Sequence, residues 1–177
     1  MNVKIIVTGP FGAGKTQFIK TISEINPVLT EQKTLTEEEA KKKEYTTVGM
    51  DFGRVTIDKN TVIYLFGTPG QERFSLTWEA LANGALGIVL VVDSTDPNSI
   101  VKARAILDFF YSRIKVPYIV AANKQDLPGA WPIEAIRTYL DLEESVKIIP
   151  CVATDKESVK RVLIELLRMI EKTLVGG

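Results

Sequence analysis

The sequence predicts a three-layer α/β/α sandwich, with helices on both faces of a mostly parallel six-stranded sheet that has one antiparallel edge strand. Short apolar runs rich in β-branched residues alternate with helical segments along the chain, as in strands buried on both faces of a parallel sheet. A polar turn at 58–60 directly joins two runs, so one strand pair is expected to be antiparallel. A glycine-rich loop after the first run opens a helix, which places a ligand at the carboxyl ends of the strands.

Six segments have the length and composition of strands. Five of them are nearly continuous in apolar character: 3–8, 61–66, 85–92, 116–122 and 146–151. The sixth, 50–58, alternates more between polar and apolar residues, and the turn at 58–60 leads from it into the next run. We therefore expect a hairpin at the edge of the sheet and right-handed crossovers between the parallel strands.

The helical pattern is clearest near the C-terminus. Thr154 and Glu157 have the spacing of a capping box at the start of this helix, and we expect the helix to pack on the sheet. Its apolar face has three- and four-residue spacing and consists of Val159, Val162, Leu163, Leu166, Leu167, Ile170 and Leu174.

The whole chain, 1–177, is expected to form one domain, because 177 residues are too few for two ordinary ones. A polar insert at about 26–47 interrupts the alternation, and loops of this length are usually functional. A solvated insert without chemistry is the alternative. The insert is predicted to contain a short, marginal helix, supported by a Thr36–Glu39 capping box and the pairs Glu37–Lys41, Glu38–Lys42 and Glu39–Lys43.

Composition excludes several classes of function. Basic and acidic residues number 22 each, so no overall field favours nucleic acid or an anionic membrane. The absence of histidine excludes a histidine base or a histidine-ligated metal, and the single cysteine, Cys151, fits a reducing compartment. The sequence has no apolar run long enough to cross a bilayer and no lipidation motif. We expect a cytoplasmic protein, monomeric when free, whose membrane contacts come only through a partner.

The stretch GPFGAGKT at 9–16 follows the first strand and precedes a helix whose apolar residues include Phe18 and Ile22. It matches the phosphate-loop pattern G-x-x-x-x-G-K-[ST] in the context that this pattern requires. Backbone N–H groups and the helix N-terminus are expected to bind phosphates. Lys15 should reach the β- and γ-phosphates, and the Thr16 hydroxyl should ligate Mg²⁺. The motif predicts a nucleoside triphosphate and leaves the base open.

The sequence NKQD at 123–126 ends the fourth apolar run. The Asp126 carboxylate can accept hydrogen bonds from guanine N1–H and the exocyclic amine, whereas adenine lacks this donor pair and would leave the carboxylate desolvated and unpaired. The stem of Lys124 can lie along the base plane, and Asn123 can tie this loop to the phosphate loop. The loop after the next strand would bring the backbone N–H of Ala153 toward guanine O6.

The order of phosphate loop, TTVGMDF, GTPGQERF, NKQD and CVAT resembles that of the Ras-like small GTPases over almost the whole chain. The pieces TVGMDF and GQERF are similar to Rab proteins, and NKQDLPGA at 123–130 is similar to Arf proteins. The mixture suggests a relative of prokaryotic or archaeal type. The resemblance implies the P-loop NTPase fold, binding of GTP and GDP with Mg²⁺, and slow hydrolysis of GTP to GDP and phosphate.

The resemblance also implies roles for single residues. Thr47, rather than its neighbour Thr46, would bind Mg²⁺ together with Thr16 and sense the γ-phosphate. Gly70 would contact the γ-phosphate, and Gln71 would orient the attacking water unless it is an exposed residue without a catalytic role. The implied nucleotide-binding residues are Gly9, Phe11, Gly12, Ala13, Gly14, Lys15, Thr16, Gln17, Thr47, Gly70, Asn123, Lys124, Asp126, Leu127, Val152, Ala153 and Thr154.

Three departures from the family pattern modify these expectations. Gly67 replaces the aspartate that fixes a magnesium-bound water, so we expect weakened rather than absent metal binding, with Asp51 as a candidate substitute. Phe11 is bulky for its loop position and could hinder an activating arginine, displace Gln71 or form a hydrophobic lid. The long insert contains no arginine that could serve as a built-in finger, which predicts slow intrinsic turnover.

Two alternative functions remain open at this point. A GTP-dependent binding module with little or no hydrolysis is favoured by Gly67 and Phe11 and opposed by Gln71. A phosphate-loop kinase would need an arginine-bearing lid and a second substrate pocket, and it would give NKQD no role. For a switch, the resemblance implies protein effectors, an activating protein and a roadblock-type partner.

Overall fold

The structure is a computed structural model that describes residues 1–26, 51–68 and 75–176, apart from the side chains of 75–77. Most of the predicted insert, including its predicted helix, lies outside the described residues. No helix in the described part of the chain has both the length and the apolar character that crossing a membrane requires. The elements are, in chain order, β1 (Asn2–Thr8), α1 (Lys15–Ile22), β2 (Asp51–Asp58), β3 (Thr61–Gly67), α3 (Ser75–Ala82), β4 (Gly87–Asp93), α4 (Pro97–Arg113), β5 (Tyr118–Asn123), α5 (Ile133–Tyr139), β6 (Ile148–Pro150) and α6 (Lys156–Gly176).

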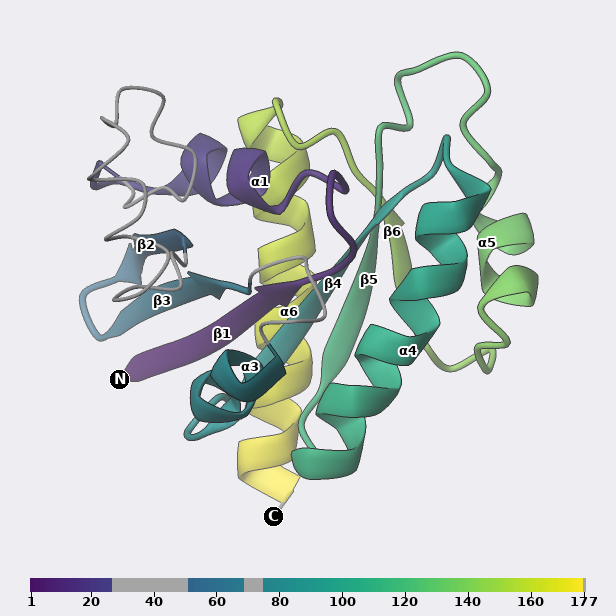
Figure 1. The fold of residues 1–177 in the computed structure, drawn as a ribbon. Helices are drawn as coiled ribbons and strands as arrows, with labels where there is room; N and C mark the ends of the chain where they lie inside the picture. The colour runs from purple at the N-terminus through teal and green to yellow at the C-terminus, as the bar shows by residue number, and fades with distance from the viewer. Residues whose placement is uncertain (27–50, 69–74, 177) are drawn as a thin grey trace, which may run out of the picture.

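The six strands form one sheet in the order β2-β3-β1-β4-β5-β6 (Figure 1). All neighbouring pairs are parallel except the edge pair of β2 and β3, which is antiparallel. The predicted fold class is therefore confirmed, including the hairpin, in whose turn Asn60 N–H donates to Asp58 Oδ1 at 2.8 Å. Strands β3, β4 and β5 each end one residue beyond the predicted apolar run, because backbone pairing continues past the last apolar side chain.

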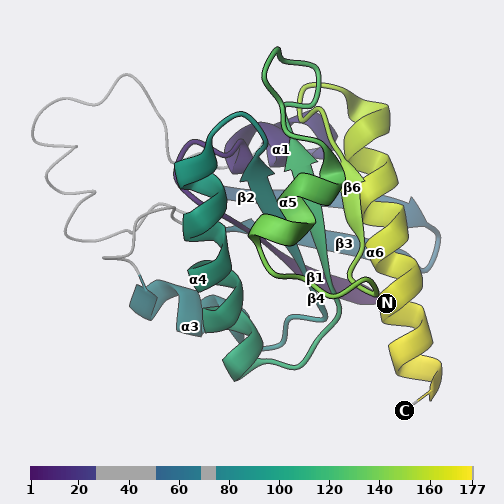
Figure 2. The same ribbon diagram turned by 90° about the vertical axis from the view of Figure 1, so that its right-hand side faces the viewer.

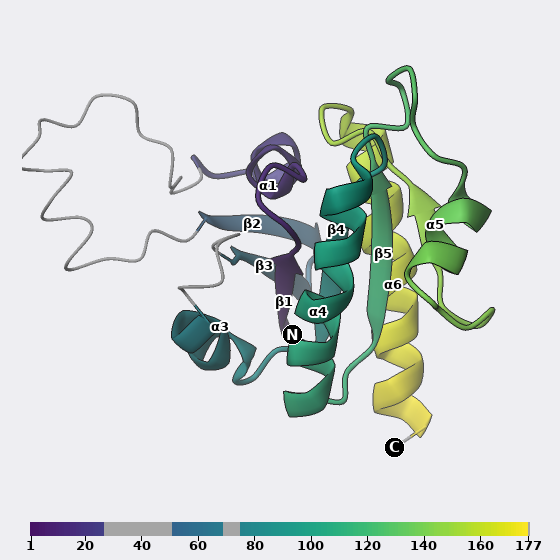
Figure 3. The same ribbon diagram turned by 45° about the vertical axis from the view of Figure 1, so that its right-hand side comes forward.

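Helices cover both faces of the sheet, as Figures 2 and 3 show. Alternate side chains of β1 supply two separate cores, because successive residues of a strand point to opposite faces. Val3, Ile5 and Val7 pack with residues of α1 and α6. Ile6 belongs to the opposite core, which contains Trp78 of α3 together with residues of α4 and α5.

The C-terminal helix confirms most of its predicted face. Its predicted apolar residues are buried from Val159 to Ile170, whereas Leu174 is 50% exposed, because the end of α6 extends past the sheet (Figure 1). The predicted capping box is wrong. The helix begins at Lys156, and Asp155 Oδ1 accepts the backbone N–H of Glu157 at 3.1 Å. The cap thus comes from the residue directly before the helix.

The parallel arrangement brings together the loops that carry the motifs. Strands β1, β4, β5 and β6 all run in the same direction, so their carboxyl ends lie at one edge of the sheet. The register pairs Asp93 at the end of β4 with Asn123 at the end of β5. The phosphate loop, the 123–126 loop and the 151–154 loop all start from this edge.

Candidate nucleotide-binding site

The phosphate loop runs from the end of β1 to the start of α1, and packing fixes its two outer glycines. Gly9 has a φ of +147°, and a Cβ there would lie 2.1 Å from the carbonyl oxygen of Val91. Gly14 has a φ of +108°, and a Cβ there would lie 2.2 Å from Nδ2 of Asn123. Both positions need glycine for conformation and for space. The phosphate loop therefore packs closely against β4 at Gly9 and against β5 at Gly14.

Lys15 occupies the interior of this loop. Its side chain is 8% exposed, and its Nζ donates to the carbonyl oxygens of Gly9 at 2.6 Å and Pro10 at 2.8 Å. Burial lowers the pKa of the Lys15 ammonium to about 8, while the negative charge of Asp51 acts in the opposite direction. Burying an ammonium is costly unless an anion compensates it. The loop is therefore suited to an anionic group placed beside Lys15.

Asn123 joins three separate loops. It is 3% exposed. Its Nδ2 donates to the carbonyl of Ala13 at 2.9 Å, and its Oδ1 accepts the backbone N–H of Ala153 at 2.9 Å. The predicted tie between the 123–126 loop and the phosphate loop is thus present, and the same side chain also holds the 151–154 loop. One amide fixes the spacing between the phosphate loop and the two loops predicted to contact the base.

The side chain of Lys124 extends from the 123–126 loop to the phosphate loop. It has a φ of +65°, a conformation that is uncommon for a residue with a side chain and occurs often at functional sites. Its Nζ donates to Asp93 Oδ2 at 2.7 Å and to the carbonyl of Gly12 at 3.1 Å. Burial of Asp93 opposes its ionisation, but hydrogen bonds from Lys124 and Thr95 hold the pKa of this carboxyl below its usual range. The ion pair therefore fixes the direction of the lysine stem.

The Thr16 hydroxyl donates to Asp51 Oδ2 at 2.5 Å, and Asp51 is 4% exposed. Hydroxyl and carboxylate oxygens are the hard ligands that Mg²⁺ prefers, so the residues present fit this ion beside the phosphates. Among the residues that the structure describes, no group of three or more His, Cys, Asp or Glu side chains could hold a metal. Phosphate and water oxygens would therefore have to supply most of the ligands.

Several other predicted residues lie around the same loops. Gln17 Nε2 donates to Thr21 Oγ1 at 2.9 Å, and the Thr21 hydroxyl donates in turn to the carbonyl of Ala153. The backbone N–H of Val152 donates to Ser158 Oγ at 2.8 Å. These contacts connect the 151–154 loop to α1 and to the start of α6. The positions of these two helices therefore determine the position of the loop.

The exposed members of the predicted set lie on the rim of the site. Phe11 is 73% exposed and Leu127 45% exposed, while Asp126 and Thr154 are exposed as well. Solvent therefore reaches these side chains in the described structure. Thr47, Gly70 and Gln71 lie outside the described residues, so their predicted roles stay predictions.

Two supporting residues were missed by sequence reasoning. Asp93 directly follows the apolar run 85–92, and a carboxylate at the end of a buried strand was the available signal. Gln125 Nε2 donates to Ser94 Oγ at 2.9 Å and to the carbonyl of Trp131 at 3.0 Å, which closes the base loop onto the end of β4. No local pattern marks this second residue, since its partners follow from the fold.

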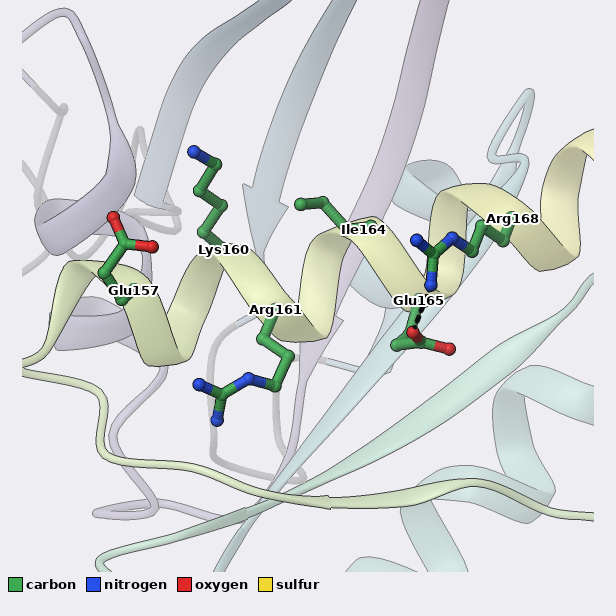
Figure 4. Close-up of a pocket in the computed structure, with 6 residues that line it drawn as sticks. All are labelled: Glu157, Lys160, Arg161, Ile164, Glu165 and Arg168. Atoms are coloured by element: carbon green, nitrogen blue, oxygen red, sulfur yellow. Dashed lines mark hydrogen bonds and ion pairs between the residues drawn. The ribbon is translucent and has the colours of Figure 1, made fainter.

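A shallow surface hollow of about 350 Å³ lies along α6 (Figure 4). In it, Glu165 forms ion pairs with Arg168 at 2.7 Å and with Lys147 at 2.8 Å. Its lining comes from one helix and contains no predicted nucleotide-binding residue: Glu157, Lys160, Arg161, Ile164, Glu165 and Arg168. The hollow along α6 is therefore separate from the candidate nucleotide site.

Comparisons of the sequence with known proteins identify a family and several relatives. A sequence model of the family described as "Conserved hypothetical ATP binding protein" matches residues 7–173. The chain is 26% identical over 179 residues to the Ras-related protein Rab-32C of Dictyostelium discoideum, covering 96% of this chain and 74% of the relative. It is 25% identical over 179 residues to the Ras-related protein SEC4 of Saccharomyces cerevisiae, covering 97% and 76%.

A third relative matches over a shorter stretch. ADP-ribosylation factor-like protein 8b of Arabidopsis thaliana is 34% identical over 100 residues, covering 55% of this chain and about half, 54%, of the relative. The Rab-like and Arf-like resemblances noted in the motifs are therefore both confirmed. The chain belongs to the family described as conserved hypothetical ATP binding protein and, by its fold, its phosphate loop and its curated relatives, is a P-loop GTPase-like member of the Ras superfamily.

Proposed function

We propose that the chain is a molecular switch that binds GTP and GDP with Mg²⁺ and slowly hydrolyses GTP to GDP and phosphate. The observation that supports this most directly is the pair of 2.9 Å hydrogen bonds of Asn123. They hold the phosphate loop at a fixed spacing from the two loops predicted to contact the base. A nucleotide that spans these loops would bind with its phosphates beside Lys15 and its base beside Lys124.

Guanine is proposed as the base, although the family description names ATP. Asp126 follows the stem of Lys124 by two residues, and its carboxylate is exposed, so it is open to the two N–H donors of a guanine edge. Adenine offers no such pair and would leave the carboxylate desolvated, which costs about 1–3 kcal/mol. The Ala153 N–H is already bonded to Asn123 at 2.9 Å, so its predicted contact with guanine O6 would require a shared hydrogen bond.

We propose that catalysis depends on positioning the attacking water and on stabilising the charge that develops on the phosphates. Mg²⁺ neutralises charge that develops on the β- and γ-phosphates when it is bound. Thr16 and Thr47 would supply hydroxyl ligands, and Lys15 would hold the same phosphates from the loop interior. Gln71 would orient the attacking water. Without an arginine in the insert, the intrinsic rate would be low, and an activating protein would be needed for fast turnover.

The proposed output is a change in the two segments around Thr47 and Gln71, which protein effectors would read. A roadblock-type partner and a monomeric free state belong to the same proposal. A binding module with little or no hydrolysis is the second candidate. It is favoured by the 73% exposure of Phe11, because a large apolar side chain on the phosphate loop offers a contact for a partner and could exclude an activating arginine.

The test is a calorimetric binding panel of GTP, GDP and ATP, each with and without Mg²⁺, on nucleotide-free protein. We expect guanine nucleotides to bind about 5–150-fold more tightly than ATP, which corresponds to 1–3 kcal/mol. Asp126→Ala should remove this preference, whereas Glu144→Ala, which removes an exposed carboxylate outside the site, should keep it. Equal affinity of the parent for ATP and GTP would contradict the proposal.

Hydrolysis is tested separately by phosphate release from GTP under single-turnover conditions. We expect slow release by the parent and slower release by Gln71→Leu, because only the latter lacks the group that orients water. Release that is unchanged in Gln71→Leu would contradict the catalytic role. Tight GTP binding with no release from the parent would instead support the binding module.

A further inference from the structure

The contact between Thr16 and Asp51 assigns a role to the carboxylate of the TTVGMDF motif. Asp51 opens β2 and is paired directly with Gly67 at the end of β3. Directly opposite residues of an antiparallel pair have their side chains on the same face of the sheet. Asp51 therefore points to the face to which a side chain at position 67 would point. Helix α1 packs against both strands, with Ile19 beside Gly67 and Thr16 bonded to Asp51.

The available space agrees with this placement. A Cβ added at Gly67 would lie 3.1 Å from the Cβ of Asp51, 3.4 Å from Asp51 Oδ2 and 2.8 Å from Cδ1 of Ile19. The carboxylate of Asp51 thus occupies room that a side chain at position 67 would need. Gly67 on β3 leaves space for the side chain of Asp51 opposite it on β2, so that one carboxylate lies beside the Thr16 hydroxyl.

On the basis of the proposed function, we infer that Asp51 holds a magnesium-bound water in place of the aspartate that is absent at position 67. The Thr16 hydroxyl donates a hydrogen bond to Asp51 Oδ2 at 2.5 Å, which leaves the lone pairs of the Thr16 oxygen for the ion. A carboxylate that is 4% exposed also places a negative charge close to a divalent cation, where little bulk water screens their attraction. Asp51 acts here as a positioning residue for the metal, since it works through Thr16 and through water.

The inference predicts a change in magnesium affinity that is measurable without turnover. A fluorescent GDP analogue is loaded, and its release rate is followed at free Mg²⁺ concentrations set with EDTA. We expect Asp51→Asn to raise the half-saturating Mg²⁺ concentration about 10–100-fold, the usual effect of removing an outer-shell carboxylate. Asp58→Asn changes the same residue type at the far, exposed end of β2 and should behave as the parent.

An exchange of the two paired residues provides the sharper test. Gly67→Asp alone places two carboxylates and a tight Cβ contact in one space, so it should not tighten Mg²⁺ binding. Asp51→Gly should weaken Mg²⁺ binding as Asp51→Asn does. The double variant Asp51→Gly with Gly67→Asp returns one carboxylate from the opposite strand, and we expect it to recover at least tenfold of the lost affinity.

The outcomes separate this inference from the proposed function. If the parent releases the GDP analogue with a Mg²⁺ dependence that Asp51→Asn and Asp58→Asn share, the role of Asp51 is wrong and the switch function stands. If the parent binds no guanine nucleotide, the proposed function itself is wrong. Thermal unfolding of each variant without nucleotide shows that it is folded, and the single Asp51→Asn variant decides the question if the double variant does not fold.

Discussion

Replacement of Asn123 by alanine should destabilise the nucleotide-free protein by about 2–6 kcal/mol. The side chain accepts the backbone N–H of Ala153 and donates to the carbonyl of Ala13, both at 2.9 Å. Ala13 and Ala153 are 0% and 4% exposed, so water cannot easily replace either partner. Each buried backbone group left unsatisfied costs about 1–3 kcal/mol, and the two costs add because the groups belong to different loops.

Urea unfolding followed by circular dichroism measures this effect. With a dependence of about 2 kcal/mol per molar urea, the midpoint of Asn123→Ala should be about 1–3 M lower than that of the parent. Asn98→Ala is the matched control, because Asn98 is exposed and surface substitutions usually change stability by less than about 0.5 kcal/mol.

A loss below about 1 kcal/mol in Asn123→Ala would refute the reasoning. It would mean that the phosphate loop and the 151–154 loop find other partners, and that their spacing does not depend on this amide. A loss in the expected range that also weakens GDP binding would support the view that one side chain organises both halves of the site.

Two further predictions follow from the pKa values. The folded-state pKa of Lys15 is lowered to about 8, so the folded, nucleotide-free protein should gain stability as pH rises from about 8 toward the unfolded value near 10.4. Bound phosphates favour the charged form of Lys15, so GDP binding at pH 8 should be accompanied by the uptake of about half a proton by this side chain. Calorimetry in buffers of different ionisation enthalpy measures this uptake, and finding none would contradict the prediction. The thiol of Cys151 is 1% exposed, and burial raises its pKa to about 11. At pH 8 the fraction of Cys151 present as thiolate should be about 100-fold below that of a thiol with a pKa near 9. Iodoacetamide should therefore react far faster with the protein unfolded in urea than with the folded protein. Equal rates would contradict the burial of Cys151.

Much of the site could be predicted from the sequence, because its motifs are local. The phosphate loop needs two glycines at fixed spacing, a lysine and a threonine, and these residues are contiguous between one strand and one helix. The structure places Lys15 inside this loop, and Asn123 makes the predicted tie to it. Loop positions such as Gln125 were not predicted, since their hydrogen bonds reach residues that only the closed loop brings near.

Whereas the strand order came from the structure, the α/β class, a mostly parallel sheet with a hairpin at its edge and the identity of the phosphate-binding loop could all be predicted from the sequence alone. These depend on periodicity and on spacing within one element, which the chain carries locally. Asp51 was already a candidate from the sequence, but its contact with Thr16 is a property of the fold. Asp51 reaches Thr16 because the β2–β3 register sets this residue opposite Gly67 and because α1 packs on that face, a meeting of three segments that no single stretch of sequence encodes.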